Sequence, residues 1–136
     1  MCVLHVSSLT TSFKDFITST NLPIYQSHEK GETKKLVKGV FHDFGFSCDV
    51  SEKPWEDFGG QLEDIELFIK TYYDDLASLK LSHTISRWWF DLPYRLRIGK
   101  EYFSQSDYLS PTTIKLLAEF DFGLELSLYP PDGKRE

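Results

Sequence analysis

The sequence predicts one small α+β domain, a mostly antiparallel sheet with helices packed on a face. Three observations lead to this fold class. Residues 44–50 alternate apolar and polar side chains, and a period of two is typical of a β-strand. Residues 61–79 repeat apolar side chains every three or four positions, which is the spacing of one face of a helix. Ser110 and Pro111 form a favourable helix start, with serine at the N-cap and proline at the first helical position.

The first half of the chain predicts three strands and one short helix. Apolar and polar residues alternate near the N-terminus, which indicates a half-buried strand. A polar stretch containing Gly31 is expected to be a loop. The expected elements are a strand at 2–7, a helix from Ser12 to Asn21, a loop at 26–35, strands at 36–41 and 44–50, and a loop at 54–60.

The second half begins with the strongest helical signal in the chain, because its apolar residues form a single stripe. The expected elements are a helix at 61–79, strands at 84–91 and 94–98, a helix from Ser110 to Gly123, and a strand at 124–129. The predicted order is therefore β-α-β-β-α-β-β-α-β. The domain is expected to cover residues 1–129, with 130–136 as a frayed tail.

The charge of the chain favours a basic partner. The formal net charge is −6, and residues 43–75 hold most of the excess, with ten carboxylates against Lys53 and Lys70. An acidic field repels phosphate backbones, so no nucleic-acid partner is expected. The same field attracts basic proteins and accelerates their association.

The remaining composition indicates a cytoplasmic protein that binds no membrane. No apolar run reaches the roughly 18 residues of a membrane span. The N-terminus has no basic region ahead of its apolar residues, as a secretory signal would. Cys2 and Cys48 are then expected to be reduced thiols.

No cofactor, metal site or catalytic residue is predicted. The four histidines have neither each other nor a cysteine at the spacings of a zinc site. Cys48 with His42 and Asp43 comes nearest to a nucleophile with its base and orienting group. Cys48 falls in an alternating apolar strand, however, where a cysteine usually behaves as a small buried hydrophobe.

Two groups of residues are candidates for partner binding. The acidic residues at 52–66 lack the calcium-loop pattern and form either a solvated helix face or a docking surface for a basic partner. Trp88 and Trp89 must point to opposite sides of a strand, so one can enter the core while the other is covered or exposed. The predicted partner-binding residues are Trp55, Glu56, Asp57, Glu63, Asp64, Glu66 and Trp88. Glu52 and Tyr102 accompany them in the acidic and aromatic groups, respectively.

Several short motifs along nearly the whole chain resemble a family of small bacterial proteins without an assigned biochemical role. Members of that kind often look like immunity proteins of polymorphic or contact-dependent growth inhibition toxin systems. Phe44 or Phe46 stands where that family typically has a tryptophan. The motifs lie at residues 10–18, 21–23, 30–32, 46–47, 61–79, 109–111, 114–119 and 124–129.

The resemblance implies an immunity protein that binds a cognate toxin, in particular a basic nuclease domain, and neutralises it. It supplies no catalytic residues. Acidic side chains would meet the toxin's lysines and arginines, and a buried aromatic residue would slow dissociation. Two alternatives stay open: a small cysteine-dependent enzyme using Cys48 and His42, and a scaffold domain that self-associates through an aromatic edge. Free in solution, the protein is expected to be a monomer or a weak dimer.

Overall fold

The chain folds into a five-stranded sheet with helices packed on it, which confirms the predicted α+β class. The computed structural model describes residues 1–99 and 104–129. Within these ranges no helix combines the length and apolarity that crossing a membrane requires. The elements are β1 (Cys2–Ser8), α1 (Lys14–Ser19), β2 (Ile24–His28), β3 (Phe44–Ser51), α2 (Phe58–Thr71), α3 (Tyr73–Ser82), β4 (Arg87–Tyr94), α4 (Pro111–Glu119) and β5 (Gly123–Leu128).

The sheet has the order β2-β3-β1-β4-β5. Its pairs are antiparallel except for β4 with β5, which run parallel. A parallel pair needs a crossover connection, and α4 lies in that connection. Strands β2 and β5 form the two edges of the sheet.

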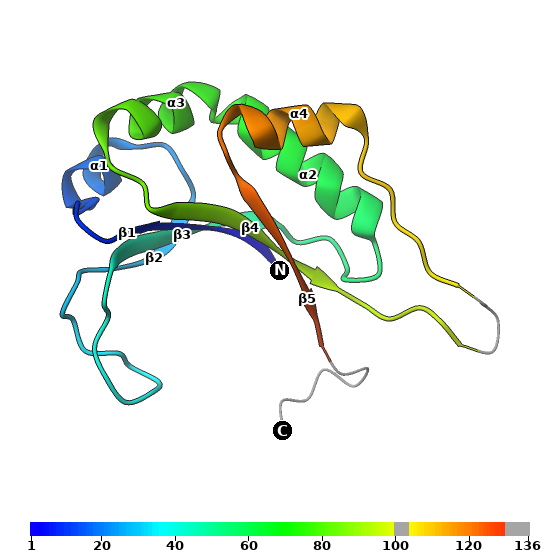
Figure 1. Ribbon diagram of the computed structural model, residues 1–136, viewed down its shortest axis with the longest axis horizontal. Coiled ribbons are helices and arrows are strands. Elements are labelled where there is room, and N and C mark those ends of the chain that lie inside the picture. Colours follow the sequence, from blue (N-terminus) through cyan, green and yellow to red (C-terminus); the bar gives the residue numbers. More distant parts are fainter. Residues whose placement is uncertain (100–103, 130–136) are drawn as a thin grey trace.

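The helices all lie on one face of the sheet (Figure 1). Strand alternation sends Leu4, Phe46 and Phe90 to that face, where all three are at most 2% exposed. The α2 stripe meets them there, and Ile65 and Ile69 are completely buried. The core therefore lies between the sheet and the helix layer.

Two predictions for the segment between α1 and β3 are wrong. Residues 24–28 form edge strand β2, which overlaps the first three residues of the predicted loop at 26–35, and the predicted strand at 36–41 lies outside the sheet. As an edge strand β2 is largely exposed and polar, so it lacks the apolar alternation that reveals half-buried strands. Residues 31–41 instead form a projecting hairpin, whose apolar residues mimic a strand pattern without being buried.

The predicted single helix at 61–79 consists of two helices that meet at Tyr72. Its apolar stripe is confirmed, because Leu62, Ile65, Leu76 and Leu79 are all at most 5% exposed. The backbone bonds of a helix continue through the junction, since the Tyr72 N–H donates to Phe68 and the Leu76 N–H to Tyr72. The junction is thus a local irregularity in an otherwise continuous helical path.

The strand predicted at 84–91 is confirmed as β4, which runs on through Pro93 to Tyr94, whereas the strand predicted at 94–98 is wrong, because residues 95–98 form no strand. The pairing of β4 with β1 ends at Asp91, so beyond that point β4 has β5 as its partner in the sheet. A proline, which has no N–H to donate, is tolerated where a strand has lost one neighbour. The predicted tail at 130–136 lies outside the described residues.

Candidate functional site

An acidic pocket lies where the end of β3 meets α2. Asp49 and Glu52 come from the end of β3 and the residue after it, and Asp64 comes from the second turn of α2. The pocket has a volume of about 300 Å³, and no lysine or arginine lines it. It therefore gathers three acidic residues in a lining that contains no basic residue.

Much of the remaining lining of this pocket is apolar or aromatic. Leu67 and Phe68 of α2, Tyr72 at the helix junction and Pro23 at the start of β2 all line it. Leu67 is 62% exposed, so part of this lining faces solvent. A pocket lined by both acidic and apolar residues matches a lysine or arginine side chain, whose stem is apolar and whose head is charged.

Hydrogen bonding leaves part of the carboxylate set unsatisfied. Asp64 Oδ2 accepts a hydrogen bond of 2.6 Å from the Ser51 hydroxyl, which fixes its orientation. Asp49 Oδ1 is buried and has no hydrogen-bond partner among the described residues. A buried carboxylate oxygen without a donor is energetically costly, and Asp49 bears this cost at the end of β3.

The structure separates the acidic residues predicted for partner binding. Only Asp64 lines the acidic pocket, while Glu63 is exposed on α2. Glu56 lies 3.8 Å from Arg95, and Asp57 caps α2 by accepting from the Gly60 N–H at 2.9 Å. Glu66 accepts a hydrogen bond from Thr113 on α4. Several of these carboxylates therefore already have partners within the chain.

The aromatic candidates also differ from one another. Trp88 is 4% exposed, and its indole N–H donates to the Phe120 carbonyl at 2.7 Å, so it presents no surface to a partner. Trp55 is half-buried, with its ring 5.0 Å from Tyr129 and Arg95 positioned over it. Trp89 points to the opposite side of β4 from Trp88 and is half-buried. Tyr102 lies outside the described residues.

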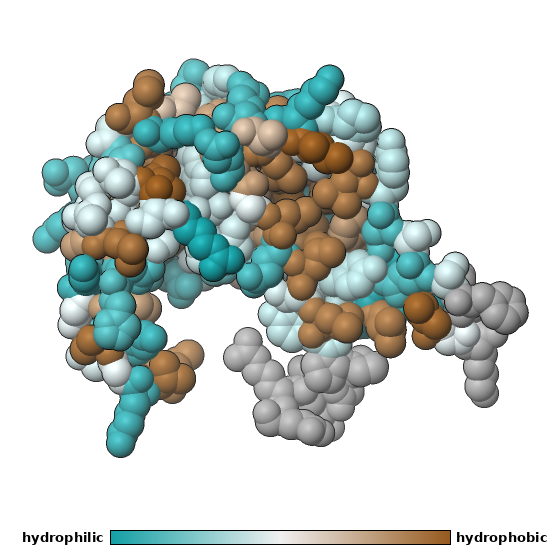
Figure 2. All heavy atoms as spheres, in the orientation of Figure 1, coloured by the Kyte–Doolittle hydropathy of each residue, from teal (hydrophilic) through white to brown (hydrophobic). Residues whose placement is uncertain are grey.

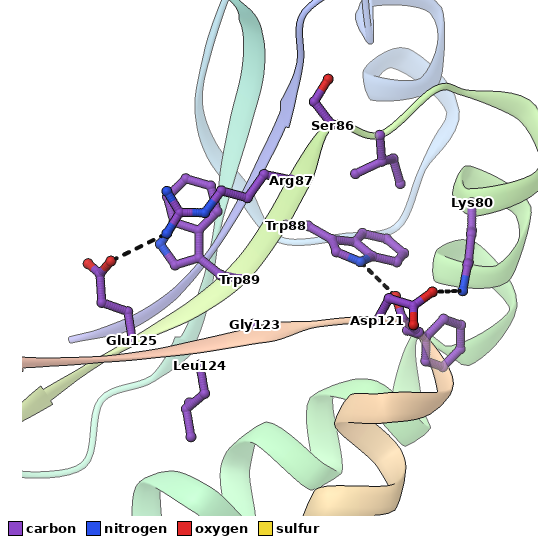
Figure 3. Close-up of a pocket in the computed structure, with 11 residues that line it drawn as sticks. Lys80, Ser86, Arg87, Trp88, Trp89, Asp121, Gly123, Leu124 and Glu125 are labelled. Carbon is purple, nitrogen blue, oxygen red and sulfur yellow. Dashed lines mark hydrogen bonds and ion pairs between the residues drawn. The ribbon is translucent and has the colours of Figure 1, made fainter.

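A larger cavity of about 650 Å³ lies beside the starts of β4 and β5, but its charges already pair with one another (Figure 3). Arg87 lies over the Trp89 ring at 4.0 Å and contacts Glu125 at 3.6 Å. Lys80 and Asp121 approach to 2.9 Å. Compared with the acidic pocket, this cavity offers a ligand little unbalanced charge.

The face of the sheet away from the helices carries a polar row that crosses all five strands. Among the described residues no helix covers this face (Figure 1). His5 on β1 lies 2.8 Å from Ser47 on β3, and Tyr25 on β2 lies beside Ser47. Asp91 on β4 lies 3.9 Å from His5 and accepts from Ser127 on β5 at 2.6 Å.

The residues of the cysteine-enzyme alternative are not brought together. Cys48 is completely buried on the core face of β3, and burial raises the pKa of its thiol to about 12. Asp43 instead accepts from Ser7 at 2.5 Å and contacts His28 at 2.8 Å. Both cysteines are free, and the described ranges contain no group of three potential metal-ligating side chains.

Sequence reasoning missed Asp49 as a member of the site. It assigned Asp49 to the polar face of a strand and Asp64 to a helix, and nothing local indicates that the two elements meet. No family model, curated protein or solved structure matches the chain.

Proposed function

We propose that the chain is an immunity protein that binds a cognate bacterial toxin, in particular a basic nuclease domain, and neutralises it. The acidic pocket formed by Asp49, Glu52 and Asp64 is the observation that carries this proposal. A lysine or arginine of the toxin would enter it, with its stem against Leu67 and Phe68 and its charge against the carboxylates.

The charge of the whole molecule supports the same reading. A net charge of −6 draws a basic domain toward the chain before contact and raises the association rate. Electrostatic steering of the toxin thus comes from the overall charge of the chain. Specificity for the toxin comes from one pocket that binds one basic side chain.

A nuclease suits this arrangement because its own substrate is polyanionic. Its active-site cleft must present positively charged groups to phosphates, and an acidic inhibitor can bind to the same groups. The chain neutralises such a toxin either by covering the cleft or by holding a basic surface nearby. Neither route requires a catalytic group on this chain.

The test is a calorimetric titration with the C-terminal domain of the protein encoded directly upstream. The wild-type chain should bind one-to-one, with an association rate that falls as salt rises. Asp49→Asn with Glu52→Gln and Asp64→Asn removes the pocket charge at nearly constant shape and should weaken binding by at least tenfold. The matched control, Asp15→Asn with Asp74→Asn and Asp121→Asn, removes the same number of negative charges from exposed residues outside the pocket and should leave the affinity within about threefold.

Two outcomes would contradict the proposal. Absence of binding by the wild-type chain at micromolar concentration would overturn the immunity function for this pair. Tight binding that the pocket variant leaves unchanged would retain the function but reject the acidic pocket as the interface. In that case Glu56, Glu63 and Glu66 would be the next residues to replace.

A further inference from the structure

We propose that the hairpin at residues 31–41 is a second contact element, which inserts Leu36 and Val37 into an apolar pocket rimmed by carboxylates on the same toxin. This inference rests on the proposed function, because it takes the same partner. It concerns a separate part of the chain, however, and is tested by separate substitutions.

The first observation is the length of the connection. Strands β2 and β3 are antiparallel neighbours, and about two to five residues suffice to join such a pair. The chain instead uses residues 29–43. Ordered connections of this excess length usually have a functional role, since the sheet does not need them.

The second observation is that the hairpin is held in one shape by its own backbone. The Phe41 N–H donates to the Glu32 carbonyl at 2.9 Å, and the Lys34 N–H donates to the Gly39 carbonyl at 3.0 Å. Gly39 has a φ of +114°, which glycine adopts readily and which lets the tip turn back. A contact element shaped before binding loses less conformational entropy when it binds.

The base of the hairpin is fixed to the body of the domain. The Phe41 ring stacks on His28 with 3.8 Å between centroids. His28 in turn contacts Asp43 at 2.8 Å, and Asp43 accepts from Ser7 on β1. These contacts connect the hairpin to both β1 and β2, so its direction relative to the sheet is set.

The third observation is the apolar tip. Leu36 is 98% exposed and Val37 is 63% exposed, although the domain has a well-packed core available. Apolar spheres accordingly lie among hydrophilic ones on the projecting hairpin (Figure 2). Apolar side chains presented at the tip of an ordered projection are well placed to enter a pocket on a partner.

The charge around the tip defines the chemistry of that pocket. Lys34, Lys35 and Lys38 surround Leu36 and Val37, in a chain that is acidic as a whole. A pocket that accepts the tip should therefore be apolar at its centre and carry carboxylates at its rim. An anionic membrane fits less well, because three lysines give weak attraction while the acidic body is repelled.

The hairpin and the acidic pocket lie at opposite ends of the same edge strand. Pro23, just before β2, lines the pocket, and His28, at the end of β2, supports the hairpin. A strand of this length spans about 17 Å, so one partner can contact both ends. A negative contact at one end and a positive contact at the other allow one orientation of the toxin and disfavour its reverse.

Surface plasmon resonance with the upstream-encoded toxin domain tests this inference. Leu36→Ser with Val37→Ser should raise the dissociation rate at least tenfold, because a central apolar contact is lost. The control is Leu81→Ser, which changes a leucine that is 89% exposed on α3 and should leave both rates unchanged. Lys34→Gln with Lys35→Gln and Lys38→Gln should slow association and reduce its dependence on salt.

The outcomes separate the two proposals. If the wild-type chain binds the toxin and the Leu36→Ser, Val37→Ser variant dissociates at a rate within twofold of the wild-type rate, the hairpin inference is overturned. The proposed function is then retained. Absence of wild-type binding overturns both. Binding to vesicles of phosphatidylcholine and phosphatidylserine is measured as well. If the wild-type chain binds these vesicles and the Leu36→Ser, Val37→Ser variant does not, the hairpin inserts into a membrane surface, and the inference of a pocket on a protein is overturned.

Discussion

His5 Nδ1 lies 2.8 Å from the Ser47 hydroxyl, across the pairing of β1 with β3. Ser47 is only 5% exposed, so this contact is largely shielded from water although it lies on the face that the helices leave free. Burial lowers the pKa of His5 from its ordinary value of 6.5, and the nearby Asp91 carboxylate partly opposes that change. The folded state therefore prefers a neutral His5.

This preference predicts a stability that decreases in mild acid. As pH falls below 6.5, the unfolded chain binds a proton at His5 before the folded chain does, so the free energy of unfolding should fall. Urea unfolding from pH 7 to pH 5 should have a shallower pH dependence in His5→Gln than in wild type. His42→Gln changes an exposed histidine and serves as the control. An NMR titration that places the His5 pKa above 6.5 would contradict the prediction.

The fold could be predicted from sequence wherever an element has one buried side. β3 and the apolar stripe shared by α2 and α3 were recognisable because the spacing of their apolar residues matches the side that is buried in the core. β2 was not, because it contains no fully buried residue and therefore shows no regular alternation of apolar and polar side chains. The acidic pocket could not be predicted for a related reason. Asp49 and Asp64 line the same pocket only because β3 and α2 pack together, and the periodicity of a short segment does not indicate how elements pack.

The paired tryptophans of β4 should respond differently to the same substitution. Trp88→Phe removes the N–H bond to Phe120 and leaves a buried carbonyl without its donor, which should cost about 1–3 kcal/mol in addition to lost packing. The Trp89 Nε1 is buried with no hydrogen-bond partner among the described residues, so Trp89→Phe removes no such bond. Denaturant unfolding should therefore find Trp88→Phe the less stable variant. Equal losses would show that packing, not the hydrogen bond, decides.

Both cysteines should resist alkylation in the folded protein. Burial raises the pKa of Cys2 and of Cys48 to about 12, and neither thiol is exposed to solvent. Because the thiolate is the reactive form, iodoacetamide at pH 8 should modify neither residue within the time that labels the urea-unfolded chain completely. Mass spectrometry counts the adducts. Rapid native labelling of Cys48 would revive the cysteine-enzyme alternative.

Asp57 allows a structural role to be separated from a binding role. Its side chain caps α2 by accepting from the Gly60 N–H, and asparagine caps as well as aspartate does. Asp57→Ala should therefore lower the free energy of unfolding by about 1 kcal/mol, whereas Asp57→Asn should leave it nearly unchanged. If Asp57 also contributes charge to toxin binding, Asp57→Asn will weaken binding without loss of stability; if both properties match wild type, Asp57 serves the helix alone.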